Sequence, residues 1–126
     1  MSTLRGIRGA NQVSADTSAA IDDATRKLLL TMVDHNEIDP GTIVAIWFTQ
    51  TPDLKAAHAP AAARSLGWRH VPLLGALEAE VDGELPRVVR ALMIAPVEAE
   101  LDEVRHVYLG AARTLREDLS QIGEVR

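Results

Sequence analysis

A single long amphipathic helix pattern occupies residues 17–36 of the chain, TSAAIDDATRKLLLTMVDHN. Its apolar residues recur at helical spacing: Ile21, Ala24, Leu28 and Met32. Asp16 or Thr17 is placed to cap the N-terminus, and the DPG turn at 39–41 requires the helix to end near residues 35–36. The apolar stripe has to be buried against another element, so the rest of the chain must supply a surface that covers it.

Strand-like runs before and after this helix supply that surface. They lie at 4–10, 42–48, 68–75 and 86–96. The run at 42–48 shows little polar alternation and is predicted to be covered on both faces. The run at 86–96 has proline at each border, where a ladder donor can be spared. An alanine-rich second helix is predicted at 55–66, started at Pro60. This alternation predicts an α/β (α+β) single domain, with a mixed β-sheet and helices packed on it.

The C-terminal stretch is ambiguous between helix and strand. Apolar residues recur there at helical spacing: Val104, Val107, Tyr108, Ala111, Ala112 and Leu115. Yet VRHVYL, from Val104, could equally begin as a strand. The polar residues 120–126 are predicted to be a flexible tail. No repeat or linker interrupts the 126 residues, so 1–126 is expected to be one domain.

The composition excludes several classes of protein. The chain has no cysteine, which excludes a disulfide framework, a thiol nucleophile and Cys-ligated metal sites. No apolar run approaches the ~20 residues that cross a bilayer, and MSTLRGIRGANQ lacks the apolar region of a signal peptide. We therefore expect a cytoplasmic protein that does not bind membranes. The net charge of −5 argues against nucleic-acid binding.

Familiar catalytic and nucleotide-binding motifs are absent from the sequence. There is no P-loop, G-x-G-x-x-G, H-E-x-x-H or G-x-S-x-G. The histidines are scattered without ligand spacing: His35, His58, His70 and His106. They are predicted to be ordinary surface or helix-cap residues, with His35 favoured by the dipole at a helix C-terminus. No metal or cofactor site is expected.

Arginine is the unusual residue type, since 11 of the 13 basic residues are arginine. A guanidinium matches a carboxylate bidentately, which lysine cannot do. Arg90 interrupts the apolar run VVRALMIA, and burying it without partners would be costly. It must pair with an acid such as Glu78, line a polar cavity, or lie at an exposed edge. With Arg8 and the single tyrosine, Tyr108, these residues suggest a site for a small dianion.

The motif RGIRGA at 5–10 adds a prediction about direction. Gly6 and Gly9 should allow close approach of the backbone to a neighbour. Because side chains alternate along a strand, Arg5 and Arg8 face opposite sides. Arg8 is predicted to meet an anion, and Arg5 to make a structural salt bridge.

Four motifs carry a resemblance that covers residues 4–119: RGIRGA at 5–10, TPDL at 51–54, GW..VPLL at 67–74 and RHVYLGAARTLREDL at 105–119. In residue identity and in order along the chain, they resemble the motifs of the monofunctional chorismate mutases of the trimeric α/β type, the AroH class. The resemblance implies a barrel-like homotrimer with active sites between subunits. It also implies the Claisen rearrangement of chorismate to prephenate, on the branch to phenylalanine and tyrosine, without a cofactor.

The resemblance implies a role for each matching residue. Arg8 corresponds to an arginine that holds a substrate carboxylate, assisted by the phenol of Tyr108. Arg90 corresponds to the arginine that reaches the ether oxygen and a carboxylate, and Glu78 to the acid that accepts a hydrogen bond from the ring hydroxyl. Arg64 would come from the adjacent subunit. Substrate contacts are also implied for a wall and a closing tail: Leu74, Gly75, Ala76, Leu77, Leu115 and Arg116.

The chain departs from the family pattern at three positions and in one spacing. Gly75 stands where a cysteine or another polar residue is frequent, His58 where an aromatic is typical, and Ala61 where a basic residue can stand. The segment between Arg64 and Trp68 is also about one residue shorter than in the family pattern. Two alternative functions stay open: a trimeric imine or enamine deaminase-like protein, and a non-catalytic trimer that binds a small anion.

Overall fold

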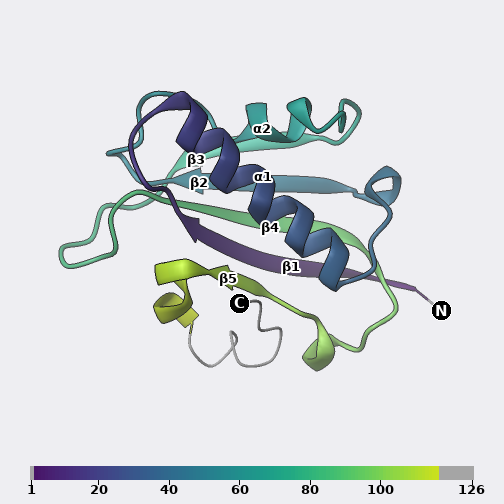
Figure 1. The fold of residues 1–126 in the computed structure, drawn as a ribbon. Helices are drawn as coiled ribbons and strands as arrows, with labels where there is room; N and C mark the ends of the chain where they lie inside the picture. Colours follow the sequence, from purple (N-terminus) through teal and green to yellow (C-terminus); the bar gives the residue numbers. More distant parts are fainter. Residues whose placement is uncertain (1, 117–126) are drawn as a thin grey trace.

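The structure, a computed structural model, describes residues 2–116, and the predicted tail at 120–126 lies outside them. The described residues form one mixed sheet of five strands in the order β3-β2-β4-β1-β5 (Figure 1). The strands are β1 (Thr3–Gln12), β2 (Ala45–Gln50), β3 (Leu73–Leu77), β4 (Val88–Val97) and β5 (Val107–Leu109). The central strands β2, β4 and β1 are antiparallel, whereas β3 pairs in parallel with β2 and β5 with β1. The predicted mixed sheet is confirmed.

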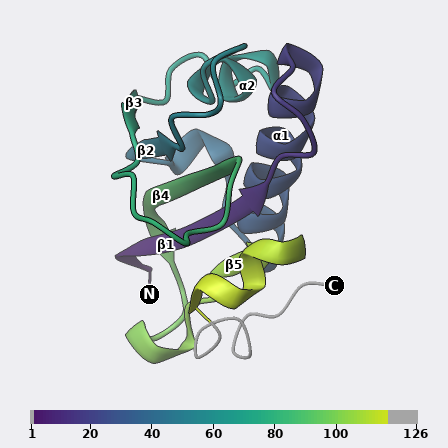
Figure 2. The same cartoon turned by 90° about the vertical axis from the view of Figure 1, so that its left-hand side faces the viewer.

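The helices lie on one face of this sheet. They are α1 (Ser18–His35) and the short α2 (Pro60–Ser65), and α1 runs along the sheet with α2 beside it (Figures 1 and 2). Three 3-10 segments complete the fold: η1 (Pro40–Thr42), η2 (Leu101–Glu103) and η3 (Gly110–Arg116). Within residues 2–116, no helix has the length and apolarity needed to cross a membrane.

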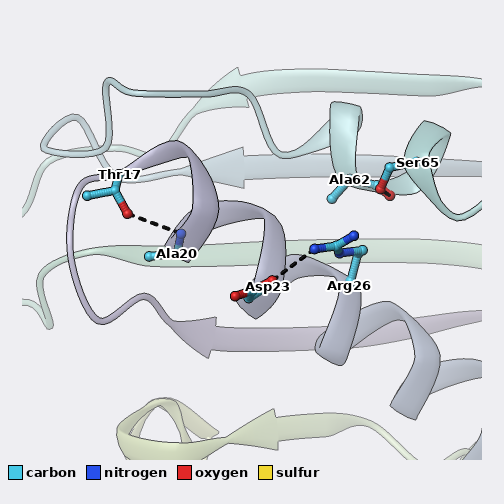
Figure 3. Close-up of polar contacts among 6 residues, drawn as sticks. All are labelled: Thr17, Ala20, Asp23, Arg26, Ala62 and Ser65. Atoms are coloured by element: carbon cyan, nitrogen blue, oxygen red, sulfur yellow. Dashed lines mark hydrogen bonds and ion pairs between the residues drawn. The ribbon is translucent and has the colours of Figure 1, made fainter.

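Helix α1 begins and ends where the sequence predicts. The hydroxyl of Thr17 accepts a hydrogen bond from the backbone N–H of Ala20 at 3.1 Å, which caps the first turn (Figure 3). One turn further on, the exposed side chains of Asp23 and Arg26 pair at 2.8 Å (Figure 3). Asn36 ends the helix as its C-cap. The predicted apolar stripe faces the sheet, where Ile21, Leu28 and Met32 are buried and Ala24 is partly buried.

The main hydrophobic core lies between the helices and the sheet. Its largest fully buried side chains come from both layers: Ile7, Ile21, Leu28, Leu29, Met32, Ile46, Phe48 and Met93. A second, smaller cluster lies on the other face and consists of Ala10, Val88, Tyr108 and Ala112, with Leu85 and Leu115 packed against it. The two clusters show that the two faces of the sheet are covered by different parts of the chain.

Glycine at position 9 is required by the contact between β1 and α1. A Cβ on Gly9 would lie 2.7 Å from the Sδ of Met32 and 2.9 Å from a methyl carbon of Leu28. A Cβ on Gly6 would meet only Leu92, at an ordinary 3.4 Å. The prediction of close approach is therefore confirmed at Gly9 and not at Gly6.

Several predicted strand bounds are shifted. Strand β2 begins at Ala45 rather than 42, because the side chain of Asp39 caps a 3-10 turn over 40–42. Strand β3 begins at Leu73 rather than 68. Along β2 buried residues alternate with more exposed ones, and Trp47 is 42% exposed. The prediction that this strand is covered on both faces is wrong for the chain by itself.

The ambiguous C-terminal stretch contains both kinds of structure. Residues 107–109 pair with β1 as a short parallel strand, and the chain then turns into the 3-10 helix η3. Val107 and Tyr108 of the apolar pattern lie in the strand, whereas Ala111, Ala112 and Leu115 lie in η3, which packs against β1 and β5.

Candidate functional site

Strand register places two of the predicted site residues, Arg8 and Arg90, on the sheet face opposite α1, which we call the open face. Residues that are directly opposite on paired strands point to the same side, and side chains alternate along each strand. Gly9 faces α1, so its neighbours Arg8 and Ala10 face away from the helix. Arg90 lies opposite both Ala10 and Thr49 and therefore shares the open face with them.

Two rows of side chains cross the open face. The first runs over all five strands and consists of Tyr108, Ala10, Arg90, Thr49 and Ala76. The second runs beside it and consists of Arg8, Leu92, Trp47 and Leu74. Arg8 and Arg90 are thus diagonal neighbours on adjacent strands, an arrangement within reach of long side chains.

Glu78 joins this face from the end of β3. Its backbone N–H donates to the carbonyl of Gln50 at 2.9 Å, which extends the β2–β3 ladder by one residue. Its carboxylate Oε1 accepts a hydrogen bond from the hydroxyl of Thr49 at 2.7 Å and lies 3.0 Å from the Nε of Arg90. The ion pair that the sequence offered as one explanation of Arg90 is therefore present.

The Arg90–Glu78 pair leaves one donor unsatisfied. The two side chains are 38% and 28% exposed, yet the Nε atom of Arg90 is itself buried. Its N–H is not directed at Oε1, so within residues 2–116 it has no aligned hydrogen-bond acceptor despite the short distance. A buried guanidinium N–H without an aligned acceptor is costly to maintain, whereas the exposed part of the Arg90 side chain is open to a charged ligand.

Arg8 is exposed at its side chain and held at its backbone by a histidine. The N–H of Arg8 donates to the Nδ1 of His106 at 2.9 Å, one residue before the β1–β5 ladder begins at Gly9 and Val107. Asn36 fixes the adjacent Arg105 through hydrogen bonds to both its N–H and its carbonyl. The imidazole is thereby fixed by two contacts: Asn36 holds the backbone of the preceding residue, and the N–H of Arg8 on β1 binds the ring.

His106 is neutral in this arrangement. Burial, with the positive charges of Arg8 and Arg116, lowers the pKa of His106 below its ordinary value. A neutral ring that accepts at Nδ1 carries its proton on Nε2. The prediction of ordinary surface or cap histidines is therefore wrong for His106, which is only 9% exposed. The sequence signal that could have singled it out is its place in the motif RHVYL, directly before a run that could form a strand.

The closing-tail residues lie near Tyr108. Tyr108 is buried, and Leu115 of η3 packs against its cluster. Arg116, at the end of η3, is near enough to His106 to affect its titration. The structure thus brings Tyr108, Leu115 and Arg116 to the β5 end of the open face.

The predicted wall divides between the two sides of β3. Leu74 and Ala76 lie on the open face, whereas Gly75 is opposite Phe48 and faces Pro60 of α2. Leu77 shares the side of Gly75 and is 71% exposed. Residues 75–77 also line a cavity of about 570 Å³ that includes His58.

Arg64 is not brought to the open face within one chain. It is exposed on α2, which packs against α1 in the helical layer. A larger cavity, of about 730 Å³, lies at the C-terminal end of α1 and is lined by none of the predicted site residues. Arg5 lies on the helical side of β1, where its guanidinium contacts the carbonyl of Ala99 and Glu100 at 3.3 and 3.8 Å. The predicted salt bridge of Arg5 and its place on the face opposite Arg8 are confirmed, and the contact of Arg8 with an anion stays a prediction.

Comparison with known proteins gives one consistent result. A family model described as chorismate mutase type I matches residues 4–119. The chorismate mutase AroH of Thermus thermophilus is 49% identical over 117 residues, which cover 92% of this chain and 96% of that protein. The AroH of Bacillus subtilis is 38% identical over 118 residues, 93% of each chain. The solved chorismate mutase of Clostridium thermocellum superposes with a TM-score of 0.84 at 37% identity, over 86% of this chain and 97% of that one.

Proposed function

The chain belongs to the chorismate mutase type I family, and we propose that its reaction takes place on the open face of the sheet, around Arg90. The protein is an isomerase that converts chorismate to prephenate in aromatic amino acid biosynthesis. The observation that carries the proposed site is the partly exposed Arg90–Glu78 pair, whose two groups lie 3.0 Å apart without an aligned hydrogen bond.

The reaction needs geometry and charge more than it needs a nucleophile. A flexible dianion must be held in a compact, chair-like shape so that one C–C bond forms as one C–O bond breaks. Negative charge develops on the ether oxygen during this step, and a cation fixed beside that oxygen stabilises the transition state. Arg90 suits this role because it projects from β4, the central strand of the sheet, and is oriented before the bond breaks.

The other residues of the open face each bind a different group of the substrate. Glu78, anchored at both its backbone and its carboxylate, accepts the hydrogen bond of the ring hydroxyl. Arg8 binds a carboxylate, and its exposed guanidinium lies diagonal to Arg90. Tyr108 assists that contact from β5. Leu115 and Arg116 of η3 close the β5 end of the site.

The site is completed by a second copy of the chain in a homotrimer. Large apolar side chains remain exposed on the open face of one chain: Leu4, Trp47, Leu74 and Leu92, at 57, 42, 58 and 39%. Exposed apolar residues gathered on one face are typical of a protein–protein interface. The partner subunit's Arg64 would then reach the site mouth, which Arg64 of the same chain does not. Sedimentation velocity of the wild type should show a trimer, and Trp47→Glu should weaken it; a monomeric wild type would contradict the assembly.

We further propose that residues 1–126 act as one domain, supported by the single sheet that both hydrophobic clusters share. We also propose that the protein is cytoplasmic. One cooperative unfolding transition and recovery in the cytoplasmic fraction are the expected results.

The decisive experiment follows the loss of chorismate absorbance by the purified protein, with prephenate confirmed as product. Arg90→Ala should lower kcat roughly 10²-fold or more, as expected for loss of one preorganised electrostatic donor. Arg26→Ala is the matched control, because it removes an arginine that pairs with a carboxylate on the far, exposed side of α1. Equal kcat for Arg90→Ala and wild type would exclude the role of Arg90.

The same assay separates the alternative functions. A folded trimer that binds prephenate without turning chorismate over would be a non-catalytic anion-binding protein. Hydrolysis of imines derived from amino acids, with chorismate ignored, would indicate the deaminase-like activity instead.

A further inference from the structure

Thr49 occupies the centre of the open face and contacts the proposed catalytic pair directly. It lies opposite Arg90 on β4 and opposite Ala76 on β3. Its hydroxyl donates to the Oε1 of Glu78 at 2.7 Å, and this is the same oxygen that faces Arg90 at 3.0 Å. One carboxylate oxygen is therefore shared between a hydroxyl and a guanidinium.

Glu78 is held by two consecutive residues of β2. Its backbone N–H is bound by the carbonyl of Gln50, and its carboxylate by the hydroxyl of Thr49. Gln50 is itself fixed, because its buried side-chain amide bonds the backbone of residues 54, 57 and 59. The hydroxyl of Thr49 thus projects from a rigid base, and this gives the carboxylate a defined position.

The restraint on Glu78 matters because Arg90 lies beside the same carboxylate. Arginine and a carboxylate prefer a bidentate pair with two parallel N–H···O bonds. Such a pair would occupy both oxygens of Glu78 and would give the Nε of Arg90 the acceptor that it lacks. The hydroxyl of Thr49 opposes this closure because it binds Oε1 from the β2 side. Among residues 2–116, no hydrogen bond reaches Oε2 of Glu78.

We propose that Thr49 is a positioning residue that keeps Glu78 from closing onto Arg90, so that one carboxylate oxygen of Glu78 and the exposed part of the Arg90 guanidinium both stay available to the substrate. This inference rests on the proposed site, since it gives Glu78 and Arg90 the roles assigned above. The free protein is held in the arrangement that the reaction uses, and no closed bidentate pair has to be broken when the substrate binds.

Thr49→Val tests the hydroxyl alone. Valine keeps the β-branched shape that a strand favours, so the variant should fold. We expect kcat/KM to fall about 10-fold, with most of the loss in kcat, because the closed pair withdraws Arg90 from the ether oxygen. Thr49→Ser restores the hydroxyl and should recover most of the activity. Thr3→Val, at the exposed start of β1, is the matched control and should leave activity unchanged.

A double-mutant cycle with Glu78→Ala distinguishes the possible failures. If Thr49 acts through Glu78, Thr49→Val should add less than twofold to the loss that Glu78→Ala causes alone. Additive losses would overturn the positioning role, and so would a Thr49→Val enzyme with wild-type kcat when Glu78→Ala is impaired. If Glu78→Ala itself retains wild-type kcat, the proposed site is wrong, and the role of Thr49 is lost with it.

Discussion

The two faces of the sheet use the same strands for different purposes. The helical face is filled by apolar side chains that leave no room for a Cβ at Gly9. The open face carries Arg8, Arg90, Glu78 and exposed apolar residues, with a buried N–H that has no aligned acceptor in the described part of the chain. Close packing gives stability, whereas the open face keeps polar groups available for a ligand and a partner. The contrast shows that stability and chemistry are separated by the alternation of side chains along each strand.

Phe48→Ala should give the largest effect on stability. Phe48 is 1% exposed on the helical face, and its removal should lower the free energy of unfolding by about 3–5 kcal/mol. Denaturant unfolding measures the change. Trp47→Ala, the next residue on the open face, is the control within one chain, since it is 42% exposed. Equal losses from both variants, measured where the protein is monomeric, would remove the distinction between the faces.

Arg90→Lys should affect turnover while leaving the fold intact. An ammonium is a point charge that cannot reproduce the planar fork of a guanidinium. We expect kcat to fall about 10²-fold, on the scale of one lost preorganised donor, with an unchanged melting temperature. Near-normal kcat in this variant would mean that charge alone is sufficient at Arg90.

Gly9→Ala sharpens the comparison on the helical face at smaller cost. The added methyl would press on Met32 and Leu28, and overpacking of this kind costs about 1–3 kcal/mol. The lower end is expected, because both contacts are at the ends of flexible side chains. Gly6→Ala, on the open face of the same strand, should be nearly neutral because its Cβ contact is ordinary. The test is whether thermal unfolding ranks the two variants in this order.

Protonation of His106 should lower both the stability and the activity of the protein, and this is the smallest of the expected effects. Its pKa is lowered in the folded state, so the unfolded chain binds more protons as pH falls below about 6.5, the ordinary histidine value. Stability should therefore decline as pH falls through that window, by at most about 1.4 kcal/mol per pH unit, and level off below the folded pKa. An imidazolium cannot accept the N–H of Arg8, so kcat/KM should fall in the same direction.

The control for this pH dependence is His106→Asn, which offers an uncharged acceptor in place of Nδ1. Its stability, measured by denaturant unfolding between pH 7 and 5, should lack the histidine-dependent decline. An identical pH profile in wild type and variant would assign the decline to other groups.

Sequence patterns predicted the local elements well and their ends less well. Thr17, the stripe of α1 and the end at Asn36 follow from capping chemistry and helical spacing, which act within a few residues. The start of β2 was predicted three residues too early, because Asp39 caps a turn that competes with the strand. The prediction that β2 is covered on both faces failed for one chain because apolar composition does not reveal what lies against Trp47.

The predicted site was incomplete for a similar reason. Arg8, Arg90, Glu78 and Tyr108 were identified by their resemblance to family motifs, and the Arg90–Glu78 pair by the cost of an isolated charge in an apolar strand. Thr49 and His106 were not found. A threonine in a strand and a histidine beside one are ordinary in sequence, and their importance comes from which residue lies opposite.

The sequence by itself determined that this chain has a long amphipathic helix, an aliphatic sheet, an unusual set of strand arginines and the motifs of its family. Only the tertiary structure decided that Tyr108, Ala10, Arg90, Thr49 and Ala76 form one row across five strands. The physical reason is register. A shift of one residue in strand pairing moves every side chain to the other face, and hydrogen bonds between distant segments set that pairing.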